Sequence, residues 1–220
     1  MSYFLLTRLA RLLTRALLGP KFHVRGLATL PTTGSLLIVS NHVSAVDPAI
    51  IGGWVPRPVW FMAKAELFKG RFAWLMRAYH AFPVIRHTAD RSALRRALAL
   101  LREGKALVLF PEGHRSDDAR LLRAEPGAGF IARHSGATLV ALGIAGTEHV
   151  LGSHQRIPRP ATVSLVFGEP FQLPERSRDG SKMDNQQTAD FLMTKIAQLL
   201  PFKYQGEYAT PASAPQSANG

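Results

Sequence analysis

The stretch from Leu36 to Pro48 constrains the fold of this chain more than any other. Its apolar run Leu36–Val39 predicts a short strand, and the polar residues that follow lead to His42. Asp47 stands directly before Pro48, a pair typical of a helix start, with aspartate as the N-cap and proline at the first helical position. We therefore expect His42 at the carboxyl end of a strand and Asp47 at the start of the next helix. Ligands bind at this edge of open α/β sheets.

His42 and Asp47 carry the side chains of a general base and its orienting carboxylate. A neutral imidazole accepts a proton near pH 7, and a carboxylate on its other nitrogen fixes the tautomer and stabilises the imidazolium. The chain contains no G-x-S-x-G motif, so we expect the substrate to supply the nucleophilic hydroxyl. The spacing alone is weak, because about one histidine in twenty has an aspartate at this distance by chance. An aspartate that caps a helix beside an unrelated histidine is the alternative.

A second strand-to-loop junction supports the catalytic interpretation. The apolar run 105–110 reads KALVLF and predicts a buried strand, and Phe110–Ser116 follows as FPEGHRS. Together with the N-H-x4-D of the first junction, this segment resembles the glycerolipid acyltransferase family. That family is marked by N-H-x4-D, a block that ends in arginine, F-P-E-G-x-R-S and then an apolar block. Phe82–Arg86 (FPVIR) fits the second of these blocks, and the resemblance covers residues 22–169.

The resemblance implies transfer of an acyl group from acyl-CoA or acyl-carrier protein to the free hydroxyl of 1-acyl-glycerol-3-phosphate, which gives phosphatidic acid. It implies a catalytic dyad of His42 and Asp47 and no cofactor, with acyl-CoA or acyl-carrier protein as the co-substrate. The substrate-binding residues that it implies are Arg86, Glu112, Gly113 and Arg115. Guanidinium groups pair bidentately with phosphate oxygens, which suits the two arginines to the phosphate of the acceptor. The glutamate and the glycine are expected to shape the glycerol site.

Two positions depart from the pattern of this family. Its members commonly have a basic residue before the Pro–Gly pair at 126–127, where this chain has Glu125. They usually have a proline where this chain has Ala141. These departures leave the dyad intact but leave the acceptor open, so that another lysophospholipid or lyso-lipid is the alternative within the family.

Composition limits the other functions that the chain can have. The absence of cysteine excludes disulfides, thiolate catalysis and cysteine–zinc sites. The formal net charge of +12 favours an anionic partner, which could be nucleic acid, an anionic bilayer or an acidic substrate. We expect no nucleic-acid partner, because the basic residues are dispersed without a known reader motif. We expect no metal, because His114, Asp117 and Asp118 lack a recognisable ligand spacing. A non-catalytic protein that binds anionic lipid is the alternative from a different class.

Residues 2–18 have the pattern of an amphipathic helix. The apolar stripe of this helix consists of Leu5, Leu9, Leu12, Leu13 and Ala16. Arginines at positions 8, 11 and 15 argue against a membrane span, and they interrupt the apolar region in a way that fits a signal peptide poorly. We expect residues 1–21 to be an anchor that lies on the cytoplasmic face of the cell membrane, on its anionic headgroups. A helix packed on the core of the protein is the alternative.

The rest of the pattern predicts one α/β domain, residues 22–204, with a mixed, largely parallel sheet flanked by helices. Further strands are expected at 59–63, 82–86, 105–110, 138–144 and 162–167, and helices at 48–54, 64–80, 90–103, 126–135 and 188–200. The apolar side chains of 64–80 fit the core, an acyl groove or contact with lipid. Residues 205–220 are rich in Ala, Pro, Ser, Gln and Gly and predict a disordered tail.

Overall fold

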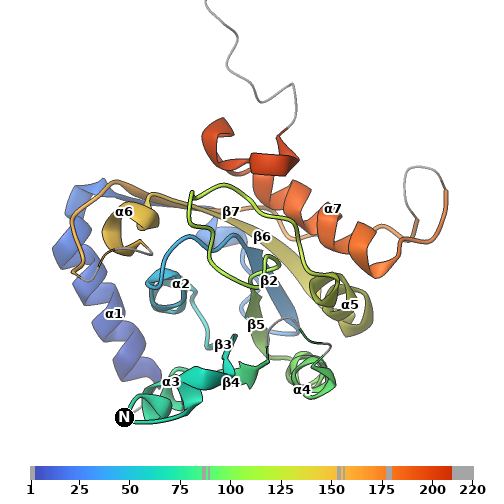
Figure 1. Cartoon of the computed structure of the whole chain (residues 1–220), viewed down its shortest axis with the longest axis horizontal. Helices are drawn as coiled ribbons and strands as arrows, with labels where there is room; N and C mark the ends of the chain where they lie inside the picture. Colours follow the sequence, from blue (N-terminus) through green and yellow to red (C-terminus); the bar gives the residue numbers. More distant parts are fainter. Residues whose placement is uncertain are drawn as a thin grey trace, which may run out of the picture.

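Seven strands form one sheet in the computed structural model, in the order β1-β7-β6-β2-β5-β3-β4 (Figure 1). The structure describes residues 3–85, 88, 90–152, 155, 157–176 and 180–209. The strands are β1 (Phe22–Arg25), β2 (Leu36–Ser40), β3 (Val59–Lys64), β4 (Ala81–Val84), β5 (Ala106–Leu109), β6 (Thr138–Ala145) and β7 (Val163–Phe167). Every neighbouring pair is parallel except β6 and β7. This confirms the predicted mixed, largely parallel sheet of an α/β domain.

Helices cover both faces of the sheet (Figure 1). The α-helices are α1 (Tyr3–Leu18), α2 (Asp47–Trp54), α3 (Ala73–Ala78), α4 (Arg91–Arg102), α5 (Pro126–Ser135), α6 (Thr147–Leu151) and α7 (Asn185–Ala197). The 3₁₀ helices are η1 (Gly19–Lys21), η2 (Leu27–Thr29), η3 (Ala65–Phe68), η4 (Phe202–Tyr204) and η5 (Gly206–Tyr208). Residues of α4, α5 and α7 share one apolar core with the sheet, and residues of α1 and α2 share the other. The domain therefore has three layers, with the sheet in the middle.

Strand β2 occupies the centre of the sheet, between β5 and β6. All of its residues are buried, and Leu36 lies opposite both Ala106 of β5 and Thr138 of β6. A parallel strand that is covered on both faces reads as a continuous apolar run, which explains the lack of alternation in this segment. The polar residues that follow β2 therefore emerge in the middle of the sheet edge.

Helices α5 and α7 pack closely where α5 has Gly129. A Cβ atom at this position would lie 1.9 Å from the carbonyl oxygen of Asn185 in α7, so that no other residue fits. Asp184 caps α7 in a capping box with Gln187, which fixes the start of the helix at this contact. The bounds of α5 agree with the prediction for 126–135.

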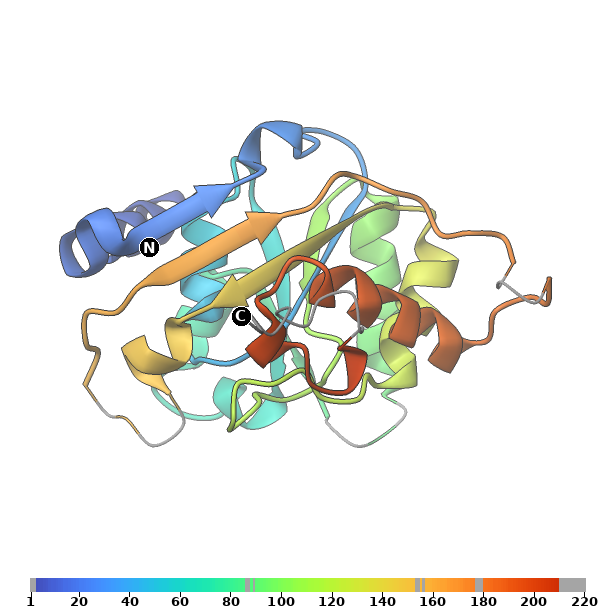
Figure 2. The same cartoon turned by 90° about the horizontal axis from the view of Figure 1, so that it is seen from above.

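Helix α1 lies against α2 and beside the edge strand β1 (Figure 2). Its buried face includes Leu6, Thr7 and Thr14, and Gly53 of α2 allows the two backbones to approach closely. The exposed large apolar side chains of α1 are Phe4, Leu5, Leu9, Leu12 and Leu13. The helix therefore packs on the protein through the face opposite to its leucine stripe. Within the described ranges, no helix has both the length and the apolar character needed to cross a membrane.

The predicted single helix over 64–80 is wrong. The segment forms η3, then a turn, then α3, and Gly70 in the turn has a φ of +88°. This left-handed conformation cannot belong to an α-helix, and glycine adopts it without a Cβ clash. Leu67, Phe72 and Trp74 of this segment are about half exposed.

The predicted start of the disordered tail at residue 205 is also wrong. Gln205 is buried, and its Nε2 donates hydrogen bonds to the carbonyl oxygens of Ala197 and Leu200. The Tyr208 hydroxyl donates to Asp190 of α7 and holds η5 on the domain. Polar and aromatic side chains hold this segment on the domain. The sequence prediction missed these contacts because it relied on the absence of apolar periodicity. Residues 210–220, the rest of the predicted tail, lie outside the described residues.

Candidate active site

Three loops meet at the carboxyl edge of the neighbouring strands β5, β2 and β6. His42 follows β2, Glu112 follows β5 and Thr147 follows β6. The loops are bonded to one another: the backbone N–H of Ser116 donates to the carbonyl oxygen of His42 at 2.8 Å. The predicted position of His42, on a loop at the carboxyl end of a strand, is confirmed.

The imidazole of His42 is held on one ring face and at one nitrogen. Its ring stacks on Phe110, with 4.1 Å between centroids and 19° between planes. Its Nδ1 lies 2.9 Å from Oδ2 of Asp47, so the structure brings the two predicted dyad residues together. The Nε2 atom makes no hydrogen bond with any residue in the described part of the chain, and the side chain is 11 % exposed. With Nδ1 bonded to the carboxylate, Nε2 is the nitrogen that a substrate can reach.

Asp47 is fully buried and accepts four hydrogen bonds. Oδ2 accepts from the imidazole and from the backbone N–H groups of Val43 and Ser44, whereas Oδ1 accepts from the hydroxyl of Thr147. The prediction that Asp47 is the N-cap of the helix is wrong. It is the first residue of α2, after the N-cap Val46, and its carboxylate bonds the loop after β2 instead of capping the helix.

Neighbouring elements hold the backbone of this loop. The side-chain amide of Asn41 donates to the carbonyl oxygen of Ile144 in β6 and accepts from its N–H, both at 2.8 Å. The hydroxyl of Ser44 donates to the carbonyl oxygen of Leu151 at 2.6 Å. These bonds fix the loop on both sides of His42, which keeps the imidazole in one position.

Glu112 connects the loop after β5 to the loop after β2. Its Oε1 accepts from the backbone N–H of His42 at 3.0 Å, and its Oε2 accepts from that of Leu122 at 2.9 Å. Burial raises the pKa of the Glu112 carboxyl to about 7, and the charge of Asp47 adds to this rise, while the two backbone hydrogen bonds oppose it. In this structure the side chain holds the two loops, and its contact with an acceptor hydroxyl stays a prediction.

The other predicted substrate-binding residues lie around the same edge. Gly113 has a φ of +73° and lies against the side chain of Glu125. Arg115 is half-buried, and no hydrogen bond or ion pair ties its guanidinium to the described residues. Arg86 lies outside the described residues. Phosphate binding by the two arginines therefore stays a prediction.

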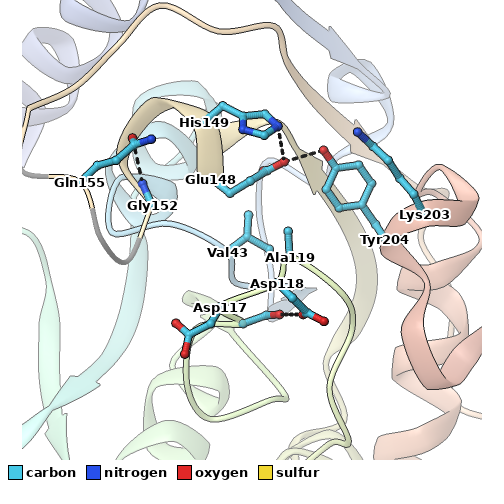
Figure 3. A pocket seen from close by; sticks show the side chains of 11 residues that line it. Val43, Asp117, Asp118, Ala119, Glu148, His149, Gly152, Gln155, Lys203 and Tyr204 are labelled. Carbon is cyan, nitrogen blue, oxygen red and sulfur yellow. Dashed lines mark hydrogen bonds and ion pairs between the residues drawn. The ribbon is translucent and has the colours of Figure 1, made fainter.

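A cavity of about 370 Å³ borders the loop after β2 (Figure 3). It is lined by Val43, Ser116, Asp117, Asp118, Ala119, Glu148, His149, Gly152, Gln155, Lys203 and Tyr204. Neither dyad residue lines it. Among the described residues that line it are three carboxylates, one lysine and one histidine.

Sequence reasoning missed Thr147, which contacts the dyad carboxylate. One hundred residues separate it from Asp47, and only the pairing of β2 with β6 brings the two together. One signal was available: like His42 and Glu112, Thr147 stands just after an apolar run that predicts a strand. A search for polar residues at every such junction finds all three.

Comparisons with known proteins agree with this geometry. The model of the acyltransferase family matches residues 21–145. The 1-acyl-sn-glycerol-3-phosphate acyltransferase of Bacillus subtilis (strain 168) is 32% identical over 160 residues, which cover 68% of this chain and 76% of that protein. The enzyme of the same name from Streptococcus pneumoniae is 29% identical over 63% of this chain. The matched region spans 51% of the streptococcal protein.

A solved structure has the same fold. It is that of the 1-acyl-sn-glycerophosphate (LPA) acyltransferase PlsC from Thermotoga maritima, with a TM-score of 0.72 and 23% sequence identity. The match covers 89% of this chain and 77% of that one.

Proposed function

This chain belongs to the acyltransferase family, and we propose that it transfers an acyl group from acyl-CoA or acyl-carrier protein to the free hydroxyl of 1-acyl-glycerol-3-phosphate. The product is phosphatidic acid. One observation supports this function above the others: a buried histidine–aspartate pair, 2.9 Å apart, leaves Nε2 of His42 accessible at the carboxyl edge of the sheet.

The dyad acts as the general base for an attack by the acceptor. Nε2 of His42 takes the proton of the acceptor hydroxyl as the oxygen forms a bond to the thioester carbonyl carbon. Asp47 stabilises the imidazolium and holds it in the productive orientation. The carbon–sulfur bond then breaks, and the thiolate takes the proton from the imidazolium. The products are the ester and the free thiol.

Arg86 and Arg115 bind the phosphate of the acceptor in this proposal. Arg115 stands in the same loop as Glu112, which bonds the backbone of His42, and its guanidinium is not engaged by the described residues. A fork of N–H donors in this loop suits a phosphate that must lie close to the reacting hydroxyl.

A second candidate acceptor is a lyso-lipid with no phosphate monoester. The observation that favours it is the contact between Glu125 and Gly113, which places an acidic side chain against the loop that carries Arg115. A carboxylate here repels a phosphate dianion and tolerates a neutral or zwitterionic headgroup.

Wild-type protein is expected to release thiol from acyl-CoA in the presence of 1-acyl-glycerol-3-phosphate and not in its absence. The measurement is a thiol-release assay with this acceptor, with a 1-acyl-glycerol that lacks phosphate, and with no acceptor. Equal rates with the two acceptors indicate the second candidate, and release without acceptor indicates a thioesterase. If acyl-CoA gives no release, acyl-carrier protein is tested as donor, and failure with both donors indicates a lipid-binding protein.

We also propose that α1 lies on the anionic surface of a membrane. Its outward face consists of Phe4, Leu5, Leu9, Leu12 and Leu13, which are 45–64% exposed. Leu67, Phe72 and Trp74 are also exposed, and the segment 65–78 that carries them ends beside the start of α1, where Tyr3 packs on Tyr79. The net charge of +12 suits anionic headgroups. This surface keeps the active site near a substrate that is itself a membrane lipid.

The double variant Leu12→Glu/Leu13→Glu is expected to lose binding to vesicles that contain phosphatidylglycerol by roughly tenfold or more, because two leucines no longer enter the apolar region. Vesicle flotation measures this loss, and turnover of a short-chain, water-soluble acceptor is expected to stay within twofold. Phe202→Glu is the matched control, because Phe202 is an exposed apolar residue on η4 at the other end of the chain. Equal flotation of the double variant and the wild type contradicts the membrane proposal.

A further inference from the structure

The first residue of α6, Thr147, touches the dyad from the side opposite to the imidazole. It is fully buried, and its hydroxyl donates to Oδ1 of Asp47 at 2.6 Å. This distance is in the range of short, charge-assisted hydrogen bonds between a hydroxyl and a carboxylate.

The hydrogen bonds of Asp47 are divided unequally between its two oxygens. Oδ2 accepts from three donors, the imidazole and the two backbone N–H groups of Val43 and Ser44. Oδ1 accepts from Thr147 alone among the described residues. A carboxylate can turn about its Cβ–Cγ bond, and a donor on Oδ1 resists this turn. Loss of the hydroxyl leaves one oxygen of a buried carboxylate without a partner, which is costly.

The surrounding fold holds Thr147 in this position. Gly146, just before it, has a φ of +93°, and a Cβ atom there would lie 1.9 Å from the carbonyl oxygen of Thr162. Oε2 of Glu148 accepts from the N–H of Gly146 at 2.9 Å. Its Oε1 accepts from the hydroxyl of Tyr204 at 2.6 Å, as Figure 3 shows. The turn that carries Thr147 thus lies closely against the residue before β7 and is connected through Glu148 to the C-terminal segment.

We propose that Thr147 is a positioning residue for acyl transfer, which orients the Asp47 carboxylate so that the carboxylate can orient His42. This inference rests on the proposed function of the dyad. A residue that follows β6 then takes part in orienting the dyad, so that the geometry of the site depends on the pairing of β2 with β6.

The test compares Thr147→Val, which removes the hydroxyl and keeps the shape, with Thr147→Ser, which keeps the hydroxyl. Thr188→Val is the matched control, because Thr188 of α7 is similarly buried and its hydroxyl donates to the backbone carbonyl oxygen of Asp184, the N-cap of that helix. Thr147→Val is expected to lower kcat by about tenfold to a hundredfold, the usual effect of losing an outer partner of a catalytic group, with KM within threefold. Thr147→Ser is expected to keep kcat within threefold of wild type, and Thr188→Val within twofold.

A second measurement does not depend on the acceptor. The low-field proton NMR signal of the hydrogen bond between His42 and Asp47 is expected to shift or broaden in Thr147→Val and to stay unchanged in Thr147→Ser and Thr188→Val. This signal tests the inference even if the wild type transfers no acyl group, an outcome that counts against the proposed function alone.

Two results overturn the inference. One is a Thr147→Val protein that keeps both kcat and the low-field signal of the wild type. The other is failure of both Thr147→Val and Thr147→Ala to fold at a temperature where Thr188→Val is folded, because Thr147 then supports the fold and not the dyad.

Discussion

Replacing His42 with glutamine is expected to reduce acceptor-dependent thiol release by roughly 10²–10⁴-fold, the range that a general base contributes. Glutamine cannot take the proton of the acceptor hydroxyl, whereas its size preserves most of the packing on Phe110. The site is otherwise kept, since the backbone N–H of residue 42 still donates to Glu112. The measurement is the rate of a single turnover with acyl-CoA and 1-acyl-glycerol-3-phosphate at saturating concentrations, which separates chemistry from product release.

His134→Gln is the control for this substitution. His134 lies in the last turn of α5, is exposed, and bonds the carbonyl oxygen of Phe130 in its own helix. This variant is expected to keep the wild-type rate. A His42→Gln protein that is folded and retains more than a tenth of the wild-type rate rules out His42 as the base.

Replacing Asp47 with asparagine is expected to reduce kcat on the order of 10³–10⁴-fold, by analogy with loss of the orienting carboxylate in other histidine–aspartate pairs. All four groups that face this carboxylate donate hydrogen bonds, and they come from His42, Val43, Ser44 and Thr147. An amide must turn its NH₂ group towards some of these donors, which leaves a buried donor unsatisfied. The variant should therefore also lose roughly 1–3 kcal/mol of unfolding free energy.

Urea unfolding measures the loss of stability of Asp47→Asn, and steady-state thiol release measures the loss of kcat. Asp184→Ala separates the two effects, because it removes the cap of α7 and costs about 1 kcal/mol without touching the site. If the two variants lose equal stability and equal activity, the loss of activity follows from unfolding, and Asp47 has no orienting role.

The positions of His42 and Asp47 were predictable because they depend on local sequence. An apolar strand, a polar loop and an Asp–Pro pair lie within one short stretch, and the contact between the two side chains spans five residues. The contact between the Asp47 carboxylate and Thr147 was not predictable in this way. Thr147 reaches Asp47 only because β6 pairs with β2, and hydrophobic patterning identifies strands without giving their order in the sheet.

The same limit applies to the helices. Helical periodicity in α1 was correct, but periodicity does not show which face meets the protein. The structure buries Thr7 and Thr14 together with Leu6 and Leu18, and Gly53 lets α2 approach the α1 backbone at Thr7. It leaves Leu5, Leu9, Leu12 and Leu13 exposed. Over 64–80 a single helix was predicted, and the left-handed turn at Gly70 interrupts it. In α1, tertiary contacts decide which face of the helix is buried, and in 64–80 a single backbone dihedral decides where the helix is broken. Composition determines neither.

The central position of β2 in the sheet affects how the protein folds while it is synthesised on the ribosome. This strand is synthesised before either of its neighbours in the sheet. Leu36 cannot pair until Ala106 of β5 and Thr138 of β6 have been synthesised. At translation speeds of about 5–20 residues per second, its five buried residues stay unpaired for several seconds. Nascent chains that stop before β6 carry an apolar strand with a free edge, and such edges favour aggregation. The hydrogen bond between Thr147 and Asp47 also forms late, because it requires β6 to pair with β2.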